Sequence, residues 1–154
     1  MKIYFDGGLR PLPAGMEIAT VVGGRAQITR SLGPGTSMEA EWLALIAAAR
    51  LAITLEASAP ILLGDCLPVI QQATGRTRTP PVHRPHLLTL QSLLPLGSRL
   101  RHVKRTQNLA GIALEKGSFT AWWSTATSPR SDQDRSGAWL DCSRTAASSR
   151  DTRP

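Results

Sequence analysis

The chain has 154 residues, 42% of them apolar, which is enough for one buried core and short for two domains of ordinary size. No apolar run is long enough to span a membrane and the first residues show no signal-peptide pattern, so we expect a cytoplasmic protein with no membrane partner. The formal charge of +7 would attract a polyanion such as nucleic acid, although excess arginine is equally consistent with solubility.

The positive charge belongs mainly to the first three quarters of the chain. Residues 1–116 carry 13 Lys and Arg against 7 Asp and Glu, whereas residues 117–154 carry 5 against 4. The two cysteines, Cys66 and Cys142, are too few and too far apart for a disulfide framework or a zinc site. We therefore expect reduced thiols and a basic folded region.

Three strand-like segments come first in the chain. They are Lys2–Asp6, Met16–Val22 and Arg25–Arg30, with Gly- and Pro-rich punctuation between them. Gly23 and Gly24 separate the second from the third, and two glycines suit a tight hairpin. This part of the chain predicts an antiparallel sheet of three strands.

A clear amphipathic helix follows at Met38–Leu55. Apolar residues recur at helical spacing, at Met38, Trp42, Leu45, Ile46, Ala49 and Ile53. Thr36 followed by Glu39 has the spacing of a capping box, which satisfies backbone donors at a helix start. The pattern predicts a long helix with one face in the core.

The next elements alternate between strand and helix. They are a buried strand at Ile61–Leu63 that ends at Gly64-Asp65, a helix from about Leu67 with Pro68 in its first turn, a basic connection over Gly75–Pro85, a short helix at His86–Leu94, a strand at Leu100–Lys104 and a helix at Leu109–Lys116. Together with the first strands, this order predicts an α/β fold with a mixed five-stranded sheet and helices on both faces.

The composition changes at Gly117 to Ser, Thr, Arg and Ala without a secondary-structure period. We therefore divide the chain into a domain at residues 1–116 and a mostly disordered tail at residues 117–154. Four aromatic side chains interrupt the tail, and they either dock on a surface or make local apolar contacts: Phe119, Trp122, Trp123 and Trp139.

Three acidic residues are predicted to meet at one rim of the sheet. Asp6 closes the first strand and Asp65 closes the fourth, and sites form at the carboxyl ends of adjacent parallel strands. Glu41 borders the apolar face of the long helix, where an unpaired carboxylate would cost several kcal/mol. A divalent cation would relieve the repulsion among these three acids while holding a phosphate.

Four motifs in this order resemble type 1 ribonuclease H. Tyr4–Gly8 resembles the first-strand motif of that family, Glu39–Ile46 its first-helix motif, Leu63–Cys66 its fourth-strand motif, and His102–Asn108 the entry to its last helix. The similarity runs from residue 1 to about residue 116. Each motif alone is weak, and their order and spacing make the set specific.

The resemblance implies endonucleolytic hydrolysis of the RNA strand of an RNA/DNA hybrid by a two-metal mechanism. Mg²⁺ is the expected cofactor and Mn²⁺ the alternative, because hard cations prefer oxygen ligands. The resemblance gives Asp6, Glu41 and Asp65 the catalytic and metal-binding roles, with Asp6 bridging the two ions.

The chain departs from the family pattern at the fourth acidic ligand. That residue follows the motif asparagine by four positions, which is Ile112 here. Glu115 lies one helical turn later and is either a replacement ligand or a solvated residue at the helix end. The mobile-loop histidine of the bacterial enzymes has no clear equivalent, and His102 is predicted to be structural.

The predicted nucleic-acid contacts come from basic residues and from positions near the carboxylates. They are Gly7, Gly8, Arg76, Arg78, Arg84, Lys104, Arg105 and Asn108. For Asn108 a cap of the last helix is the alternative, and for the two glycines a simple loop. The sequence leaves three functions open: a hybrid-specific endonuclease, a weak or inactive nucleic-acid-binding module, and an interaction domain that uses its aromatic tail.

Overall fold

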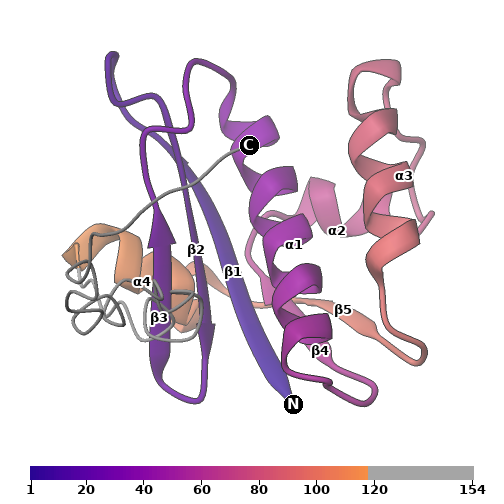
Figure 1. The fold of residues 1–154 in the computed structure, drawn as a ribbon. Coiled ribbons are helices and arrows are strands. Elements are labelled where there is room, and N and C mark those ends of the chain that lie inside the picture. Colours follow the sequence, from indigo (N-terminus) through magenta and orange to yellow (C-terminus); the bar gives the residue numbers. More distant parts are fainter. Residues whose placement is uncertain (118–154) are drawn as a thin grey trace, which may run out of the picture. The chain divides into compact units, whose positions relative to one another are not determined.

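The computed structural model describes residues 1–117, and these form one five-stranded mixed sheet (Figure 1). The strand order is β3-β2-β1-β4-β5. The first three strands, β1 (Lys2–Leu9), β2 (Met16–Val22) and β3 (Arg25–Thr29), are antiparallel. Strands β4 (Ile61–Gly64) and β5 (Arg99–His102) add in parallel beyond β1. The predicted fold class is confirmed.

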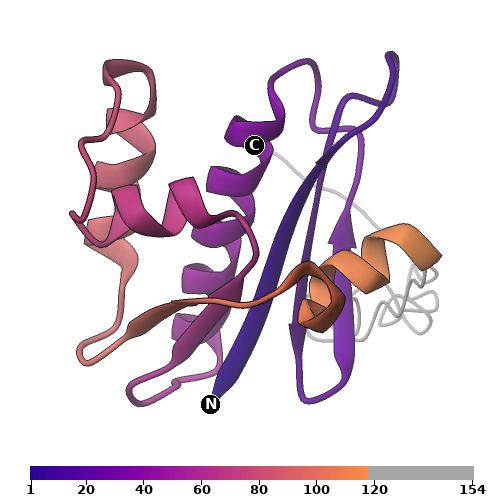
Figure 2. The ribbon, with the colours of Figure 1, turned by 180° about the vertical axis from the view of Figure 1, so that it is seen from behind.

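Helices cover both faces of this sheet (Figures 1 and 2). On one side lie α1 (Ser37–Thr54), α2 (Leu67–Ala73) and α3 (Arg84–Leu93), and on the other lies α4 (Leu109–Lys116). Two single 3₁₀ turns precede α3 and α4, η1 at Pro81–His83 and η2 at Arg105–Gln107. Every predicted helix is present, with ends within about two residues of those expected, a common spread for helix boundaries.

The alternation of side chains along β1 creates two cores. Ile3 and Phe5 are fully buried against α1, whereas Tyr4 packs with the smaller cluster beneath α4. Successive side chains of a strand point to opposite faces, so Asp6 belongs to the same face as Tyr4. The central strand therefore carries its carboxylate on the α4 side of the sheet.

Helix α1 begins where the sequence predicted, because Thr36 accepts a hydrogen bond from the backbone N–H of Glu39. A row of alanines at every fourth position is fully buried: Ala40, Ala44, Ala48 and Ala52. Ile53 was predicted to belong to the buried face and is 47% exposed. It follows Ala52 by about 100° around the helix, which turns it away from the sheet.

Strand β1 continues beyond the point where the sequence predicted its end. Asp6 was expected to close the strand, but β1 pairs with β2 through Leu9, and Gly7 and Gly8 lie within it. The local sequence Asp-Gly-Gly is typical of a turn, and pairing with a distant strand overrides that preference.

The predicted tail lies outside the described residues except for Gly117, and so do its four aromatic side chains. Within residues 1–117, no helix is both long enough and apolar enough to cross a membrane.

Candidate metal centre

The centre forms where β1 and β4 separate. Their parallel pairing runs from Lys2↔Ile61 to Tyr4↔Leu63 and then stops, while β1 continues against β2. Asp6 therefore lies on β1 just beyond the end of its pairing with β4, and Asp65 directly follows the last residue of β4. The predicted meeting of these two acids at the rim is confirmed, although Asp6 is inside its strand.

Glu41 reaches the same place from the first half of α1. Glu41 is buried. One carboxylate oxygen from each of Asp6, Glu41 and Asp65 lies within 4.8 Å of the other two. Among the described residues, these three are the one group of His, Cys, Asp or Glu side chains with a spacing that suits a metal ion. Three elements far apart in the sequence thus supply a compact set of hard oxygen donors.

Burial and mutual repulsion disfavour the ionised carboxylates. Desolvation, with a hydrogen bond and repulsion from Asp65, raises the pKa of Asp6 to about 7. Desolvation, with repulsion from Asp6 and Asp65, raises the pKa of Glu41 to about 8. The Oε2 atom of Glu41 is buried and has no hydrogen-bond partner within residues 1–117. An unpaired buried carboxylate oxygen is costly, and a cation bound there would remove that cost.

Asn108 ties the strands of the centre to α4. Its side chain is fully buried, and its Nδ2 donates to the carbonyl oxygen of Phe5 at 3.0 Å, to Asp65 Oδ1 at 3.0 Å and to Asp6 Oδ1 at 3.3 Å. Its Oδ1 accepts from the backbone N–H of Ala110, which caps α4 as the sequence favoured. A side chain buried in this way is not available for the predicted nucleic-acid contact.

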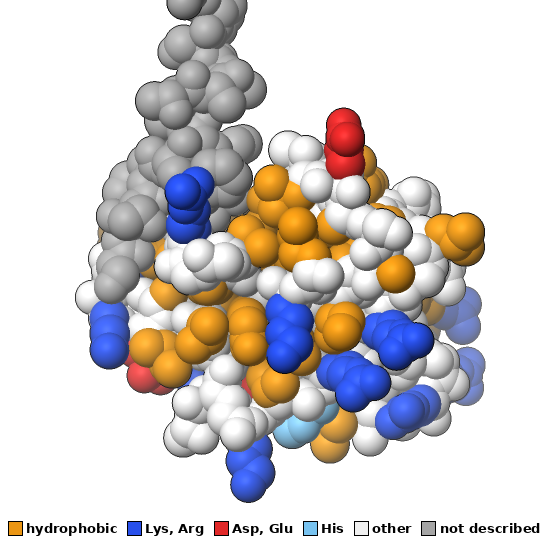
Figure 3. Space-filling model, turned by 90° about the horizontal axis from the view of Figure 1, so that it is seen from below, with side chains coloured by type: hydrophobic (Ala, Val, Ile, Leu, Met, Phe, Trp, Pro, Cys, Tyr) orange, Lys and Arg blue, Asp and Glu red, His pale blue; other side chains and the backbone are white. Residues whose placement is uncertain are grey.

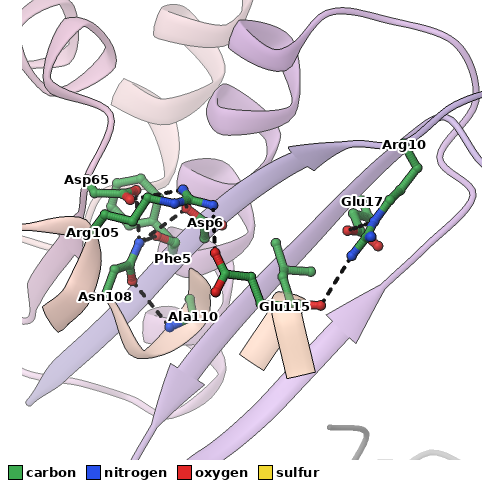
Figure 4. A network of polar contacts seen from close by, with 10 residues as sticks. Phe5, Asp6, Arg10, Glu17, Asp65, Arg105, Asn108, Ala110 and Glu115 are labelled. Atoms are coloured by element: carbon green, nitrogen blue, oxygen red, sulfur yellow. Dashed lines mark hydrogen bonds and ion pairs between the residues drawn. The ribbon is translucent and has the colours of Figure 1, made fainter. Parts of the chain in front are cut away.

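Arg105 places a positive charge against the centre (Figure 4). Its guanidinium lies 3.1 Å from Asp65 Oδ2, 3.6 Å from Asp6 Oδ1 and 3.3 Å from Glu115 Oε1. The Arg105 side chain is 60% exposed and that of Glu115 is 65% exposed. Glu115 thus contacts the guanidinium and is outside the group of acids that suits a metal ion. The sequence predicted phosphate contact for Arg105 and gave no sign of these ion pairs.

The first of the two glycines after Asp6 has a structural role that the sequence did not reveal. A Cβ atom on Gly7 would lie 2.2 Å from the backbone carbon of Ala40, so Gly7 allows α1 to pack directly on β1. At Gly8 a Cβ would lie 3.2 Å from the Glu17 side chain. For Gly7, which is buried, close approach of a helix replaces the predicted approach of a sugar-phosphate backbone.

Helix α4 comes close to the centre without adding a carboxylate. A Cβ on Gly111 would lie 3.4 Å from Asp6 Oδ2, and the partly buried Ile112 follows at the position where the resemblance expected an acid. His102 contacts the carbonyl oxygen of Asp65 through Nε2 at 3.1 Å, in keeping with a structural role. Burial raises the pKa of the Cys66 thiol to about 11, which keeps it neutral.

The remaining basic residues predicted to contact nucleic acid are exposed: Arg76, Arg78, Arg84 and Lys104. Arg78 and Arg84 line a hollow of about 510 Å³ together with Gln72, Leu87 and Leu88. Lys and Arg side chains are also spread over the face in Figure 3 among apolar ones. Positive charge alone therefore does not locate a binding surface.

A second charged cluster, which no sequence pattern revealed, lies on the α4 side of the sheet. Glu17 is buried on β2, with Arg10 at 2.7 Å (Figure 4). Arg30 lies 3.6 Å from the same carboxylate. Arg10 also donates to the carbonyl oxygen of Leu114 at 3.4 Å, near the end of α4. These contacts pair a buried charge and attach α4 to the sheet, which is a structural role.

Comparisons with known proteins agree with the fold. Residues 16–116 match the sequence model of the family described as Reverse transcriptase-like. No curated protein sequence matches the chain.

Several solved structures resemble this one. RNase H1 from the halophilic archaeon Halobacterium salinarum NRC-1 is 28% identical, with a TM-score of 0.61 over 75% of this chain and 97% of that one. The N-terminal RNase H domain of rv2228c from Mycobacterium tuberculosis is 25% identical, with a TM-score of 0.61 over 75% of this chain and 93% of that one. LC11-RNase H1, solved in complex with an RNA/DNA hybrid, is 18% identical, with a TM-score of 0.58 over 75% of this chain and 97% of that one. At this level of identity the similarity supports the fold alone.

Proposed function

This chain belongs to the Reverse transcriptase-like family and has a ribonuclease H-like fold, and on that basis we propose that it is a metal-dependent endonuclease that hydrolyses the RNA strand of RNA/DNA hybrids. The observation that carries the proposal is the convergence of Asp6, Glu41 and Asp65 within 4.8 Å. Structural relatives that are RNase H1 proteins support the same substrate class.

The residues present fit a divalent cation. The donors are carboxylate oxygens, which Mg²⁺ and Mn²⁺ prefer, and among the described residues Glu41 Oε2 is buried without a hydrogen-bond partner. Asp6, Glu41 and Asp65 would hold the cation. When bound, it would supply charge stabilisation for the phosphate and lower the pKa of attacking water.

The chain's own residues would position this chemistry. Asn108 donates to both Asp6 and Asp65, which fixes the orientation of the two carboxylates. The overall reaction adds water across the P–O3′ bond, with a 5′-phosphate and a 3′-hydroxyl as products. Because a hybrid is A-form-like, recognition by shape and by RNA 2′-hydroxyls would give little base preference.

Phosphate contacts are proposed for the exposed basic residues. Arg76, Arg78, Arg84 and Lys104 would bind the sugar-phosphate backbone, as would Arg105 at the edge of the centre. Gly8 is the glycine of the first motif that is partly exposed, so it alone of the pair retains the proposed approach to the substrate.

A cleavage assay tests the proposal directly. The purified full-length chain is incubated with a labelled RNA/DNA hybrid in Mg²⁺, in Mn²⁺ or in EDTA. Cleavage of the RNA strand should require the metal and should fall by at least two orders of magnitude in Asp6→Asn. Double-stranded RNA and single-stranded DNA run alongside as substrate controls. Equal cleavage by the parent chain and Asp6→Asn would reject the enzyme.

A second candidate is a catalytically weak or inactive nucleic-acid-binding module of the same fold. It is favoured by Ile112 at the expected place of the fourth acid and by the ion pairs that Arg105 makes with Asp6 and Asp65. Its signature would be salt-sensitive binding of the hybrid without metal-dependent turnover. The same protein samples distinguish the two candidates when binding and cleavage are measured together.

A further inference from the structure

The two sides of the carboxylate group differ in charge. On the α1 side, Glu41 offers a buried oxygen that has no hydrogen-bond partner in the described part of the chain. On the α4 side, Arg105 already places a guanidinium against Asp6, Asp65 and Glu115, at distances of 3.1 to 3.6 Å (Figure 4). A cation is therefore lacking on one side and supplied by the protein on the other.

A second divalent ion on the α4 side would lack a suitable set of ligands. Position 112 carries the apolar side chain of isoleucine, and Glu115 directs its carboxylate to Arg105 from an exposed position. An ion there would also lie beside the guanidinium of Arg105, and two neighbouring positive charges repel each other strongly.

We propose that the guanidinium of Arg105 takes the place of a second metal ion, so that this centre binds a single divalent cation through Asp6, Glu41 and Asp65. The proposal rests on the proposed function only in taking the centre to be a metal site. Before the cation binds, Arg105 acts as a positioning residue, because its guanidinium holds Asp65 and Asp6 together at the rim.

Counting bound Mn²⁺ tests this without any cleavage. The free ion is followed by electron paramagnetic resonance as Mn²⁺ is added to the full-length chain, and Asp6→Asn reports binding elsewhere on the protein. We expect one Mn²⁺ per chain above that background. Arg105→Gln should bind its ion roughly tenfold more tightly, because a neighbouring positive charge has been removed. Arg105→Gln combined with Ile112→Asp should bind two ions.

Two control variants separate the local charge from other effects. Arg105→Lys keeps a cation at the centre and should bind Mn²⁺ within about threefold of the parent affinity. Arg50→Gln removes one positive charge at the far end of α1 and should also leave the affinity unchanged. Circular dichroism checks that each variant is folded, and the substitutions of Arg105 should be tolerated because its side chain is 60% exposed.

The outcomes are distinct from those of the cleavage assay. Two ions of similar affinity in the parent chain, an unchanged affinity in Arg105→Gln, or no Mn²⁺ binding in either protein would each overturn the proposal. One bound ion without hybrid cleavage would support the role of Arg105 and reject the enzyme. Hybrid cleavage by a chain that binds two ions would support the enzyme and reject the role of Arg105.

Discussion

Asn108 and Asp65 are 43 residues apart in the sequence, and the side-chain amide of Asn108 donates to Asp65 Oδ1 at 3.0 Å. The same amide group donates to the carbonyl oxygen of Phe5. One side chain thus joins the end of β4, the middle of β1 and the start of α4. The positions of Asp6 and Asp65 therefore depend on a buried link between elements that are far apart in the sequence.

Replacing Asn108 should damage both stability and metal binding. Asn108→Ala removes a helix cap and leaves the Phe5 carbonyl oxygen without its donor, so we expect a loss of about 2 to 4 kcal/mol in the free energy of unfolding. Chemical denaturation measures this loss.

Asn108→Asp is the matched variant, because it keeps the size of the side chain and a cap oxygen while adding a negative charge. It should be less stable than the parent chain in EDTA and should recover a large part of the loss when Mg²⁺ is added. Equal stability of the parent and both variants would contradict the structural role of Asn108.

Gly7→Ala should unfold the domain more easily, because the new Cβ would lie 2.2 Å from the backbone of Ala40. Backbone atoms of a packed helix cannot move aside cheaply, so a cost of at least about 1 to 3 kcal/mol is expected. Gly8→Ala is the neighbouring control, since the atoms nearest its Cβ would belong to side chains rather than to backbone, the first of them in Glu17 at 3.2 Å. In thermal unfolding, the midpoint temperature of Gly7→Ala should be well below that of Gly8→Ala. The reverse order would mean that Gly7 is not the contact between β1 and α1.

The stability of the metal-free protein should fall as the pH rises. The pKa of Asp6 is raised from 3.8 to about 7 and that of Glu41 from 4.5 to about 8. Between the unfolded and folded values the native state binds more protons than the unfolded chain, so the free energy of unfolding decreases with pH. The decrease should begin near pH 4 and be complete a little above pH 8.

Urea unfolding in EDTA at about pH 5 and about pH 9 measures this decrease. Mg²⁺ should restore stability at the higher pH, because the cation favours the ionised carboxylates. The double variant Asp6→Asn with Glu41→Gln lacks both titrating groups and should show a much flatter pH dependence. A parent chain that is more stable in EDTA at the higher pH would contradict the sign of both shifts.

Arg78→Ala should weaken hybrid binding and reduce its salt dependence. Arg78 is exposed and lines the hollow between α2 and α3, where a phosphate contact would release counterions. We expect the slope of log K against log salt to become shallower by about one unit. Arg50→Ala, at the end of α1, removes the same charge elsewhere and should leave the slope unchanged. Fluorescence anisotropy over a salt series in EDTA provides the measurement. Equal slopes for Arg78→Ala and Arg50→Ala would mean that Arg78 does not contact the hybrid.

The sequence determined the order and type of the secondary-structure elements and the identity of the three acids. Helical spacing in α1, the Thr36 cap and the Gly23-Gly24 hairpin are local signals, and all three are present in the folded domain. The position of Glu41 beside an apolar face also predicted its burial. These features follow from periods of 3.6 and 2 residues, which the printed sequence carries directly.

Only the tertiary structure decided how the centre is completed. Pairing with β2 extends β1 beyond Asp6, and direct packing of α1 explains Gly7. The ion pairs of Arg105 join η2 to side chains 40 and 99 residues away, and the buried amide of Asn108 spans similar separations. Such contacts depend on where distant backbones lie in space, and no local pattern of residue types encodes those positions.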